Sequence, residues 1–294
     1  MAVLSRELLA EIRRIEIVTR RLVNQQMAGQ YQSVFKGRGM SFDEVRQYMA
    51  GDDPRTIDWN VTARTGEPYV KTYVEERELT VLIMVDMSGS MAFGTARDEK
   101  RVVAARLAAM MAFSAIKNGD RVGLVAFTDT VECFVPPKKG RKHVMRIIDE
   151  ILRFDPVGSG TDLGEALQFV GRVQRRKAVV FLISDFLDAG YERPLHVTAR
   201  RHDLIPLTVV DPAEEILPEL GLLFLEDAEG RGIFAIDSGS LSVRRGYARA
   251  QAARAQGRKA DLQRYGVSPI VVRTDARDYA APLVNYFRIR ARRA

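Results

Sequence analysis

From about residue 79 onward, the sequence alternates between short, almost continuously apolar runs and longer segments with a helical pattern. Three of the apolar runs are LTVLIMVD (79–86), AVVFLISDF (178–186) and LIPLTVVD (204–211). A strand that is apolar along both faces is typical of a parallel sheet with helices on both sides. Parallel neighbours need crossover connections, which the helical segments supply. The sequence therefore predicts an α/β fold with a doubly wound, mostly parallel sheet.

The other expected elements fit around these runs. Helices are expected where apolar residues recur every three or four positions. Two short strands are expected around a turn at 128–130, and a hairpin is expected over 221–237. The expected helices cover 98–120, 141–154, 162 onward, 189–202 and 241–265, and a last strand at 269–274 precedes a final helix.

The first part of the chain has a different pattern. Residues 4–26 carry apolar side chains at helical spacing with Arg and Glu between them, which predicts an amphipathic helix. Residues 30–78 are dense in charge and in turn residues, which indicates an irregular charged segment. The predicted organisation is an N-terminal helix and charged segment over 1–74, followed by one α/β domain over 75–294.

Composition limits the class of protein. No apolar run approaches the roughly 20 residues of a membrane-spanning helix, and the charged N-terminal residues lack the apolar core of a signal peptide. The single cysteine, Cys133, excludes an internal disulfide framework and suits a reducing compartment. We therefore expect a cytoplasmic protein without membrane insertion. The net charge is +7, but acidic and basic residues are interspersed, which argues against nucleic acid as the main partner.

Oxygen-bearing side chains follow the apolar runs. Asp86, Ser88 and Ser90 end the first run, Thr161 lies in the loop GSGTD, and Asp185 ends the second run. Ligands of an open parallel sheet gather at the carboxyl ends of its strands. Carboxylates and hydroxyls without histidine or cysteine suit a hard cation, so the pattern predicts a Mg²⁺ site that Mn²⁺ or Ca²⁺ could also occupy.

Each part of this pattern also has an ordinary structural interpretation. Asp, Ser and Gly after a strand can form a simple polar turn. Thr161 could merely precede a helix, because Asp162 and Glu165 have the spacing of a capping box. We expect Ser184 to be a hydrogen-bonding neighbour of the site. The three histidines, His143, His196 and His202, fall on expected helices among charged residues and are predicted to be solvated.

The residues Asp86-x-Ser88-x-Ser90, Thr161 and Asp185, in this order after these strands, resemble the metal-ion-dependent adhesion site of von Willebrand factor A domains. The resemblance implies that Ser88, Ser90 and Thr161 bind the metal directly. It implies that Asp86 and Asp185 act mainly through metal-bound water. One coordination position would stay open for a carboxylate of a partner protein, so the site would serve binding and no reaction.

The preceding segment carries a second resemblance. The stretches FDEVRQYMAGDDPRTIDWNVTAR (42–64) and YVKTYVEERE (69–78) resemble an uncharacterised bacterial family of A-domain-like proteins. Members of that family are typically encoded beside MoxR-type AAA+ ATPases. The resemblance implies a MoxR-type ATPase as partner, a carboxylate-bearing client protein, and a chaperone-like role in the maturation or assembly of client complexes.

The charged residues of this segment allow two interpretations. They could form a partner-binding surface, or they could be an ion-pair clamp that fixes the segment to the following domain. Dense mixed charge usually satisfies itself locally, which favours the clamp, with the single tryptophan as a packing anchor. The residues concerned are Asp52, Asp53, Arg55, Asp58, Trp59 and Arg64.

An enzyme is the alternative to a binding module. A serine hydrolase would need G-x-S-x-G, but Asp86 and Ser90 occupy the two glycine positions around Ser88. A Mg²⁺-dependent phosphotransferase or phosphatase could use Asp86 as nucleophile, although Ser88 stands where its general acid would be and no lysine can be assigned. No P-loop motif is present.

A nucleic-acid-binding protein is a further alternative, and it would use the basic helix at 241–265. We expect that helix to be a solvated face beside an Ala-rich buried one. The predicted function is therefore a non-enzymatic, metal-dependent protein-binding module.

Overall fold

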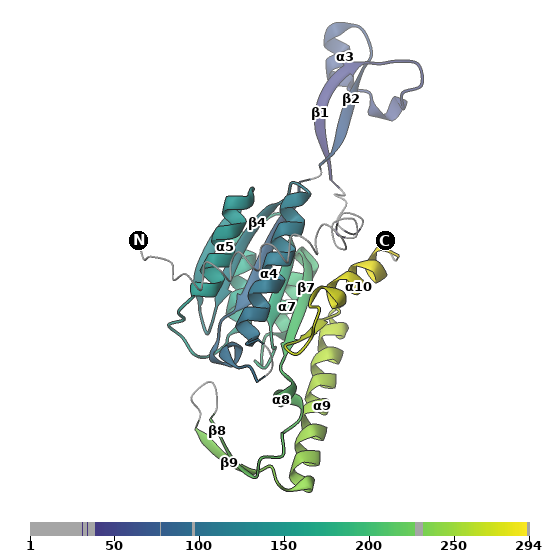
Figure 1. Cartoon of the computed structure of the whole chain (residues 1–294). Coiled ribbons are helices and arrows are strands. Elements are labelled where there is room, and N and C mark those ends of the chain that lie inside the picture. The colour runs from purple at the N-terminus through teal and green to yellow at the C-terminus, as the bar shows by residue number, and fades with distance from the viewer. Residues whose placement is uncertain are drawn as a thin grey trace. The chain divides into compact units, whose positions relative to one another are not determined.

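The structure is a computed structural model (Figure 1), and it describes residues 31, 34, 39–76, 78–95, 98–226 and 232–292. The chain divides into two compact units. One unit is Phe35–Glu78, and the other is an α/β unit formed by Met1–Val34 and Leu79–Ala294. The helix predicted at 4–26 lies outside the described residues.

The α/β unit is built on a six-stranded sheet with the order β10-β7-β6-β3-β4-β5. All neighbouring strands are parallel except β4 and β5, which form an antiparallel edge. This arrangement confirms the predicted doubly wound, mostly parallel fold. The strands are β3 (Thr80–Asp86), β4 (Arg121–Phe127), β5 (Val131–Lys138), β6 (Val179–Ser184), β7 (Asp203–Val210) and β10 (Ile270–Arg273).

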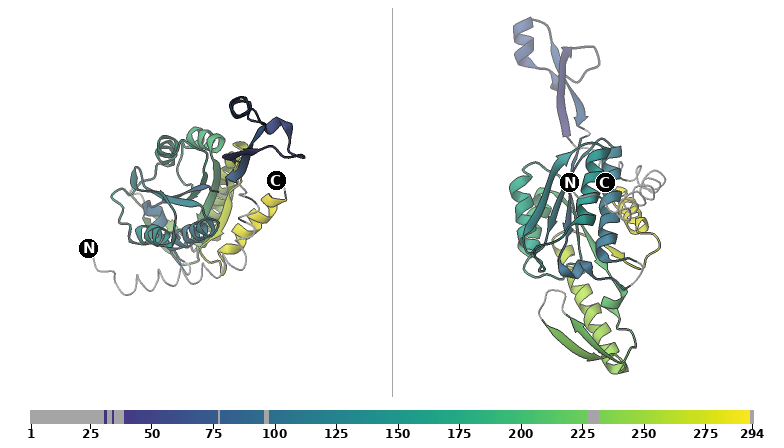
Figure 2. Two further views of the ribbon diagram at one scale, coloured as in Figure 1. Left: turned by 90° about the horizontal axis from the view of Figure 1, so that it is seen from above. Right: turned by 60° about the vertical axis from the view of Figure 1, so that its left-hand side comes forward.

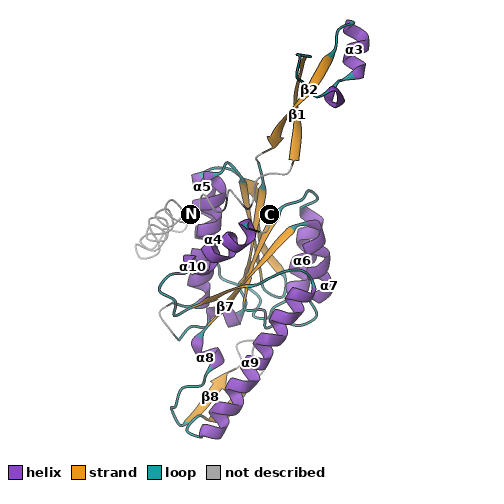
Figure 3. Ribbon diagram, turned by 90° about the vertical axis from the view of Figure 1, so that its right-hand side faces the viewer, coloured by secondary structure: helices purple, strands orange, loops and turns teal. Residues whose placement is uncertain are grey.

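Helices cover both faces of this sheet (Figures 2 and 3). On one face lie α4 (Lys100–Lys117), α5 (Arg141–Arg153) and α10 (Ala280–Ala291). On the other face lie α6 (Leu163–Val173) and α7 (Glu192–Arg201). Both faces of the central strands are thus withdrawn from water, which is why their sequences are apolar without alternation.

The core on the α6–α7 face shows how the sequence pattern becomes packing. Leu82 of β3 and Val125 of β4 lie in one buried cluster with Leu167 of α6 and Leu195 of α7. Burying a leucine of this kind contributes about 1.5–3 kcal/mol. The same cluster includes Leu262, which comes from a much later helix.

The connections reverse direction in the middle of the sheet. From β3 the chain passes to β4 on one side, whereas from β6 it passes to β7 on the other side. The carboxyl ends of the neighbouring strands β3 and β6 therefore flank the switch point of the sheet, where open α/β sheets bind ligands. Asp86 and Ser184 are the last residues of these two strands.

After β7 the chain forms a short helix, an antiparallel hairpin and a long helix: α8 (Pro212–Glu215), β8 (Leu222–Glu226), β9 (Ile233–Asp237) and α9 (Leu241–Arg264). The hairpin confirms the prediction for this region. The predicted Ala-rich buried face of α9 is wrong, because Leu262 is its only buried residue. Only the C-terminal end of α9 reaches the core, so most of its small residues stay exposed.

Among the described residues, every helix is either too short or too polar to span a lipid bilayer.

The unit Phe35–Glu78 is a second antiparallel hairpin of β1 (Gly39–Gln47) and β2 (Tyr69–Glu76). The connection between its strands holds η2 (Pro54–Thr56) and α3 (Trp59–Thr65). The expectation of an irregular segment is therefore wrong for these residues. The two strands lie far apart in the sequence, so no short turn signal marked them as partners.

Candidate metal centre

Asp86 lies completely buried at the carboxyl end of β3. Its Oδ1 accepts a hydrogen bond from the backbone N–H of Ser88 at 3.0 Å, and its Oδ2 accepts one from Ser184 Oγ at 2.6 Å. The Ser184 hydroxyl also accepts from the N–H of Phe186 at 3.0 Å. Ser184 therefore holds Asp86 in place, in agreement with the neighbouring role predicted for it.

The two serines connect Asp86 to the end of β6. Ser88 precedes the short η3 turn (Gly89–Ala92), and its Oγ lies 3.1 Å from Ser90 Oγ. The Ser90 hydroxyl donates to Asp185 Oδ2 at 2.7 Å. The structure thus brings Asp86, Ser88, Ser90 and Asp185 together at the switch point of the sheet, although they come from two segments about a hundred residues apart.

The backbone beyond β6 is unusual at Phe186, which has a positive φ of 55° although it is not glycine. Such a conformation is uncommon for a bulky residue and persists only where the surroundings hold it. Phe186 is buried, and its ring packs edge-on against Tyr191. In this turn the N–H of Leu187 donates to Asp185 Oδ1 at 3.2 Å, and this bond holds the Asp185 carboxylate in its orientation.

The loop that carries Thr161 reaches the same place. The N–H of Gly89 donates to the carbonyl of Ser159 at 3.0 Å, which ties the loop to the serine turn. Thr161 itself is half-buried. Asp162 accepts from the N–H of Glu165 at 2.7 Å and is the N-cap of α6, as predicted.

Glu132 on β5 supports the start of this loop. Its carboxylate accepts from the N–H groups of Val157 at 2.9 Å and Gly158 at 3.0 Å, and it also accepts from the Thr128 hydroxyl. Burial alone would raise the pKa of Glu132, but these hydrogen bonds lower it below its usual value. Glu132 was not recognised from the sequence because strand and loop are separated by a helix.

Lys100, the first residue of α4, is a further residue of this cluster that the sequence did not reveal. Its side chain is completely buried, and its Nζ lies 2.8 Å from Asp185 Oδ2. It also forms an ion pair with Glu214 of α8. A lysine at the start of an otherwise apolar helix is the only signal that the sequence offered, and it did not point to either partner.

Burial and charge determine the electrostatics of this cluster. Burial, followed by the charge of Asp185, raises the pKa of Asp86 to about 6, although the bonds from Ser184 and Ser88 act in the opposite direction. Burial alone would lower the pKa of Lys100, but the carboxylates of Asp185 and Glu214 raise it above its usual value. Burial raises the pKa of Glu214. One ammonium group therefore pairs with the carboxylates of Asp185 and Glu214, next to the buried carboxyl group of Asp86.

The donor set fits a hard divalent cation. It consists of carboxylate and hydroxyl oxygens, which Mg²⁺ prefers, and the excess of buried carboxylate charge favours a cation. Within the part of the chain that the structure describes, no group of three or more His, Cys, Asp or Glu side chains is placed to hold a metal. Any metal held here would depend on the serine and threonine hydroxyls. The ligand roles of Asp86, Ser88, Ser90, Thr161 and Asp185 stay a prediction.

The histidines lie elsewhere, and the prediction that they are solvated is wrong for His202, while His143 and His196 are half-buried. His143 Nε2 lies 2.9 Å from the carbonyl oxygen of Val122. The His196 ring lies against the Tyr265 ring, with the centroids 5.3 Å apart. His202 is buried. The helices α5 and α7 turn these residues toward neighbouring elements, which charge patterning along the sequence does not show.

Three aspartates of the Phe35–Glu78 unit have their hydrogen-bond and ion-pair partners within that unit. Asp52 accepts two bonds from the Arg46 guanidinium, at 2.6 and 2.8 Å. Asp53 is the N-cap of η2, and Asp58 is the N-cap of α3 and lies 3.2 Å from Lys71 Nζ. These contacts stabilise the unit itself.

Three further residues of that unit point into solvent. Arg55 and Arg64 are exposed. Trp59 is 70% exposed, so its predicted role as a packing anchor is wrong. Trp59 begins the short helix α3, and the hairpin is too small to cover an indole ring at that position.

Residues 44–257 match the family described as "Protein of unknown function DUF58". The chain belongs to this family. The DUF58 chain is also 34% identical, over 293 residues, to "Uncharacterized protein Rv1480" of Mycobacterium tuberculosis (strain ATCC 25618 / H37Rv), and the match covers 98% of this chain and 91% of that protein. A shorter relative, "Uncharacterized protein MAV169" of Mycobacterium avium, is 33% identical over 166 residues, which is 54% of this chain and 95% of that one.

Two solved structures have low similarity to the DUF58 chain. One is the conserved hypothetical protein BatB from Bacteroides thetaiotaomicron, with a TM-score of 0.48 and 17% identity over 74% of this chain and 100% of that one. Another is the SpRpn10 VWA domain, with a TM-score of 0.38 and 12% identity over 71% of this chain and 94% of that one. At these scores neither likeness bears on function.

Proposed function

We propose that this DUF58 protein is a non-enzymatic protein-binding module that recognises a partner through a bound divalent cation. The observation that carries the proposal is the convergence of Asp86, Ser88, Ser90 and Asp185 at the switch point of the sheet, linked by the hydrogen bonds Ser88–Ser90 and Ser90–Asp185. When bound, Mg²⁺ would supply an open coordination position for a carboxylate of the partner.

The residues of this chain would have distinct tasks in such a centre. The hydroxyls of Ser88, Ser90 and Thr161 are neutral donors, so they would leave the cation short of negative charge and receptive to a partner carboxylate. Ser184 fixes the orientation of Asp86. Lys100 neutralises part of the charge of Asp185. The cation would then bind a carboxylate of the partner more readily than the carboxylate of Asp185.

We propose a MoxR-type AAA+ ATPase as the working partner, with a chaperone-like role in maturation or assembly of a client complex. The support for this partner is the resemblance carried by residues 42–64 and 69–78 and by the metal-site residues. Because Arg55, Trp59 and Arg64 are exposed, we favour the partner surface over the clamp for this part of the segment. We propose a cytoplasmic location, which the single cysteine supports.

One observation favours a second candidate function. A phosphotransferase that uses Asp86 as nucleophile would need a lysine beside the site, and Lys100 lies there. However, Lys100 bonds to Asp185 and Glu214, and Asp86 is fully buried with both carboxylate oxygens bonded to protein donors. The binding module is therefore the better supported function, and an assay for Mg²⁺-dependent phosphatase activity tests the alternative.

The first experiment is calorimetric titration of Mg²⁺ and of Mn²⁺ into the wild type and into the double variant Asp86→Ala/Ser88→Ala. The matched control is Asp155→Ala/Ser268→Ala, which removes the same side-chain types at exposed positions. We expect binding to the wild type and the control and none to the site variant. Equal binding to all three proteins would contradict the proposed centre.

The second experiment asks whether the cation serves recognition. A MoxR-type ATPase, purified separately, is tested for binding to the immobilised protein with Mg²⁺ and with EDTA. We expect binding that EDTA and the site variant both abolish. Binding that is indifferent to EDTA would show that the partner uses another surface, and the exposed residues Arg55, Trp59 and Arg64 would be the next to substitute.

A further inference from the structure

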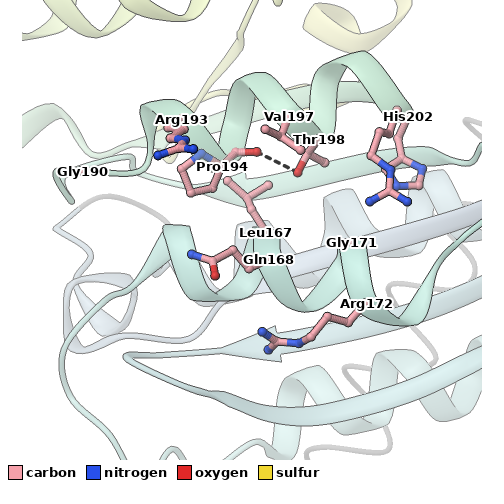
Figure 4. Close-up of a pocket in the computed structure, with 11 residues that line it drawn as sticks. Leu167, Gln168, Gly171, Arg172, Gly190, Arg193, Pro194, Val197, Thr198 and His202 are labelled. Carbon is pink, nitrogen blue, oxygen red and sulfur yellow. Dashed lines mark hydrogen bonds between the residues drawn. The ribbon is translucent and has the colours of Figure 1, made fainter.

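A cavity of about 700 Å³ lies between α6 and α7 (Figure 4). Arg193 lies near the start of α7 and His202 directly follows its end, so the cavity extends along this helix. Thr198 is turned back to its own helix, because its hydroxyl donates to the carbonyl of Pro194 at 2.9 Å. The lining residues are Leu167, Gln168, Gly171, Arg172, Gly190, Arg193, Pro194, Val197, Thr198, Arg201 and His202.

His202 is the feature of this cavity that calls for a ligand. Its side chain is 3% exposed, and neither ring nitrogen has a hydrogen-bond partner among the residues that the structure describes. Burial, and then the charge of Arg201, lowers the pKa of His202, so the ring is neutral at physiological pH and offers one donor and one acceptor. An unpaired buried polar group of this kind costs about 1–3 kcal/mol, which a bound ligand would recover.

The charge of the lining is positive. Among the described residues that line the cavity, none is acidic. Arg172 forms an ion pair with Glu165 of the same helix, α6. No carboxylate partner is described for Arg193 or Arg201. An arginine at a helix C-terminus, such as Arg201, could simply complement the helix dipole. Arg193 is the second residue of α7, where the dipole disfavours a positive charge, so it needs another explanation.

The rest of the lining leaves room for an organic group. Gly171 of α6 has no side chain, and a Cβ atom there would lie 3.7 Å from Arg201 Nη1, so the guanidinium lies across this glycine. Leu167, Pro194 and Val197 add apolar surface. The volume is within the usual range of small-molecule sites, about 300–1,000 Å³.

We propose that the α6–α7 cavity binds a small organic anion with a phosphate or carboxylate group, held by Arg193 and Arg201 and hydrogen-bonded by His202. This site is separate from the metal centre and does not depend on it. The arginines would supply the charged contacts, the apolar residues would contact the organic part, and the imidazole would supply a hydrogen-bonding group that is otherwise unpaired among the described residues.

The test titrates ADP, citrate and inorganic phosphate separately into the wild type in the presence of EDTA, which removes any contribution from the metal centre. Binding is followed by calorimetry and by the NMR signals of the His202 ring. We expect ADP or citrate to bind more tightly than inorganic phosphate and to shift the His202 signals. A preference for ADP would identify a phosphate ligand, and a preference for citrate would identify a carboxylate ligand.

The variants are Arg193→Gln/Arg201→Gln and the control Arg200→Gln, which removes an exposed arginine of α7 outside the cavity. We expect the double variant to lose roughly tenfold or more in affinity and the control to bind like the wild type. All three arginines are exposed, so these variants should fold, and thermal unfolding checks that they do. Absence of binding to the wild type at millimolar ligand, or equal weakening by the control, would overturn the proposal.

Discussion

Lys100 and Asp185 form an ion pair in the interior of the α/β unit, with Nζ 2.8 Å from Oδ2 and side chains that are 0% and 3% exposed. The same ammonium group pairs with Glu214, whose backbone carbonyl accepts from the Tyr247 hydroxyl of α9 at 3.2 Å. A cation at the candidate metal centre would compete with Lys100 for Asp185. The centre is therefore connected, through Lys100 and Glu214, to the helix that carries the basic residues.

Replacement of Lys100 tests this connection. We expect Lys100→Met to lower the free energy of unfolding by about 3–5 kcal/mol without metal, because the buried carboxylate of Asp185 and the partly buried one of Glu214 lose their counter-charge. We also expect Mg²⁺ to stabilise the variant more than the wild type, because Asp185 is then released from the ion pair. Urea unfolding with and without MgCl₂ measures both effects. Lys142→Met, at an exposed position of α5, is the control and should change stability by less than about 0.5 kcal/mol.

The pKa of Asp86 predicts how stability depends on pH. The pKa is about 6 in the folded protein, above the ordinary value of 3.8. In that interval the folded state holds a proton that the unfolded state has lost, so without metal the free energy of unfolding falls as pH rises through this window and stays lower above it. We expect Asp86→Asn to remove this fall and to stabilise the metal-free protein at neutral pH by about 1–3 kcal/mol.

Urea unfolding between about pH 3 and pH 8, an interval that includes both pKa values, measures the effect. Asp155→Asn, at an exposed site, should keep the wild-type profile. If millimolar Mg²⁺ is present and binds, the wild-type profile should rise toward neutral pH, since the ionised carboxylate is then paired with the cation. A wild-type profile that is flat without metal would contradict the raised pKa.

Two glycine substitutions should have opposite effects. A Cβ atom on Gly158 would lie 2.0 Å from Asp129 Oδ1 and 2.6 Å from Thr128 Oγ1, so Gly158→Ala must displace these side chains or the loop that leads to Thr161. We expect a loss of about 1–3 kcal/mol and weaker Mg²⁺ binding. Gly257 lies within α9 with no atom within 4 Å of its Cβ position, so Gly257→Ala should stabilise the protein by up to about 1 kcal/mol. Thermal unfolding and calorimetry compare the two variants.

The β8–β9 hairpin carries aromatic side chains in solvent. Phe224 is 71% exposed and Phe234 is 59% exposed, so neither contributes much to folding. We expect the double variant Phe224→Ser/Phe234→Ser to change the free energy of unfolding by less than about 0.5 kcal/mol. We also expect it to reduce self-association, measured by sedimentation, and to reduce the capture of a MoxR-type ATPase, because it removes exposed apolar surface. A large loss of stability would show instead that these side chains are buried in solution.

Much of the α/β unit could be predicted from local sequence patterns. The runs that became β3, β6 and β7 are apolar on both faces, and only the interior of a parallel sheet accepts such strands. Short-range signals also predicted that β8 and β9 pair as a hairpin and that Asp162 is the N-cap of α6. The β1–β2 hairpin was missed because its strands pair across a long connection that holds two further elements.

The residues of the candidate site also fall into two groups, those that the local sequence predicts and those that only packing brings together. Local sequence is enough to predict that Asp86, Ser88 and Ser90 follow one central strand and that Asp185 follows another, because strand ends and their polar residues are local features. Three relationships became visible in the folded protein alone: Lys100 lies against Asp185, Glu132 holds the loop of Thr161, and His202 is buried without a hydrogen-bond partner among the described residues. These relationships depend on which helix face meets which strand end. That choice is made by packing across the whole sheet, and no short stretch of sequence records it.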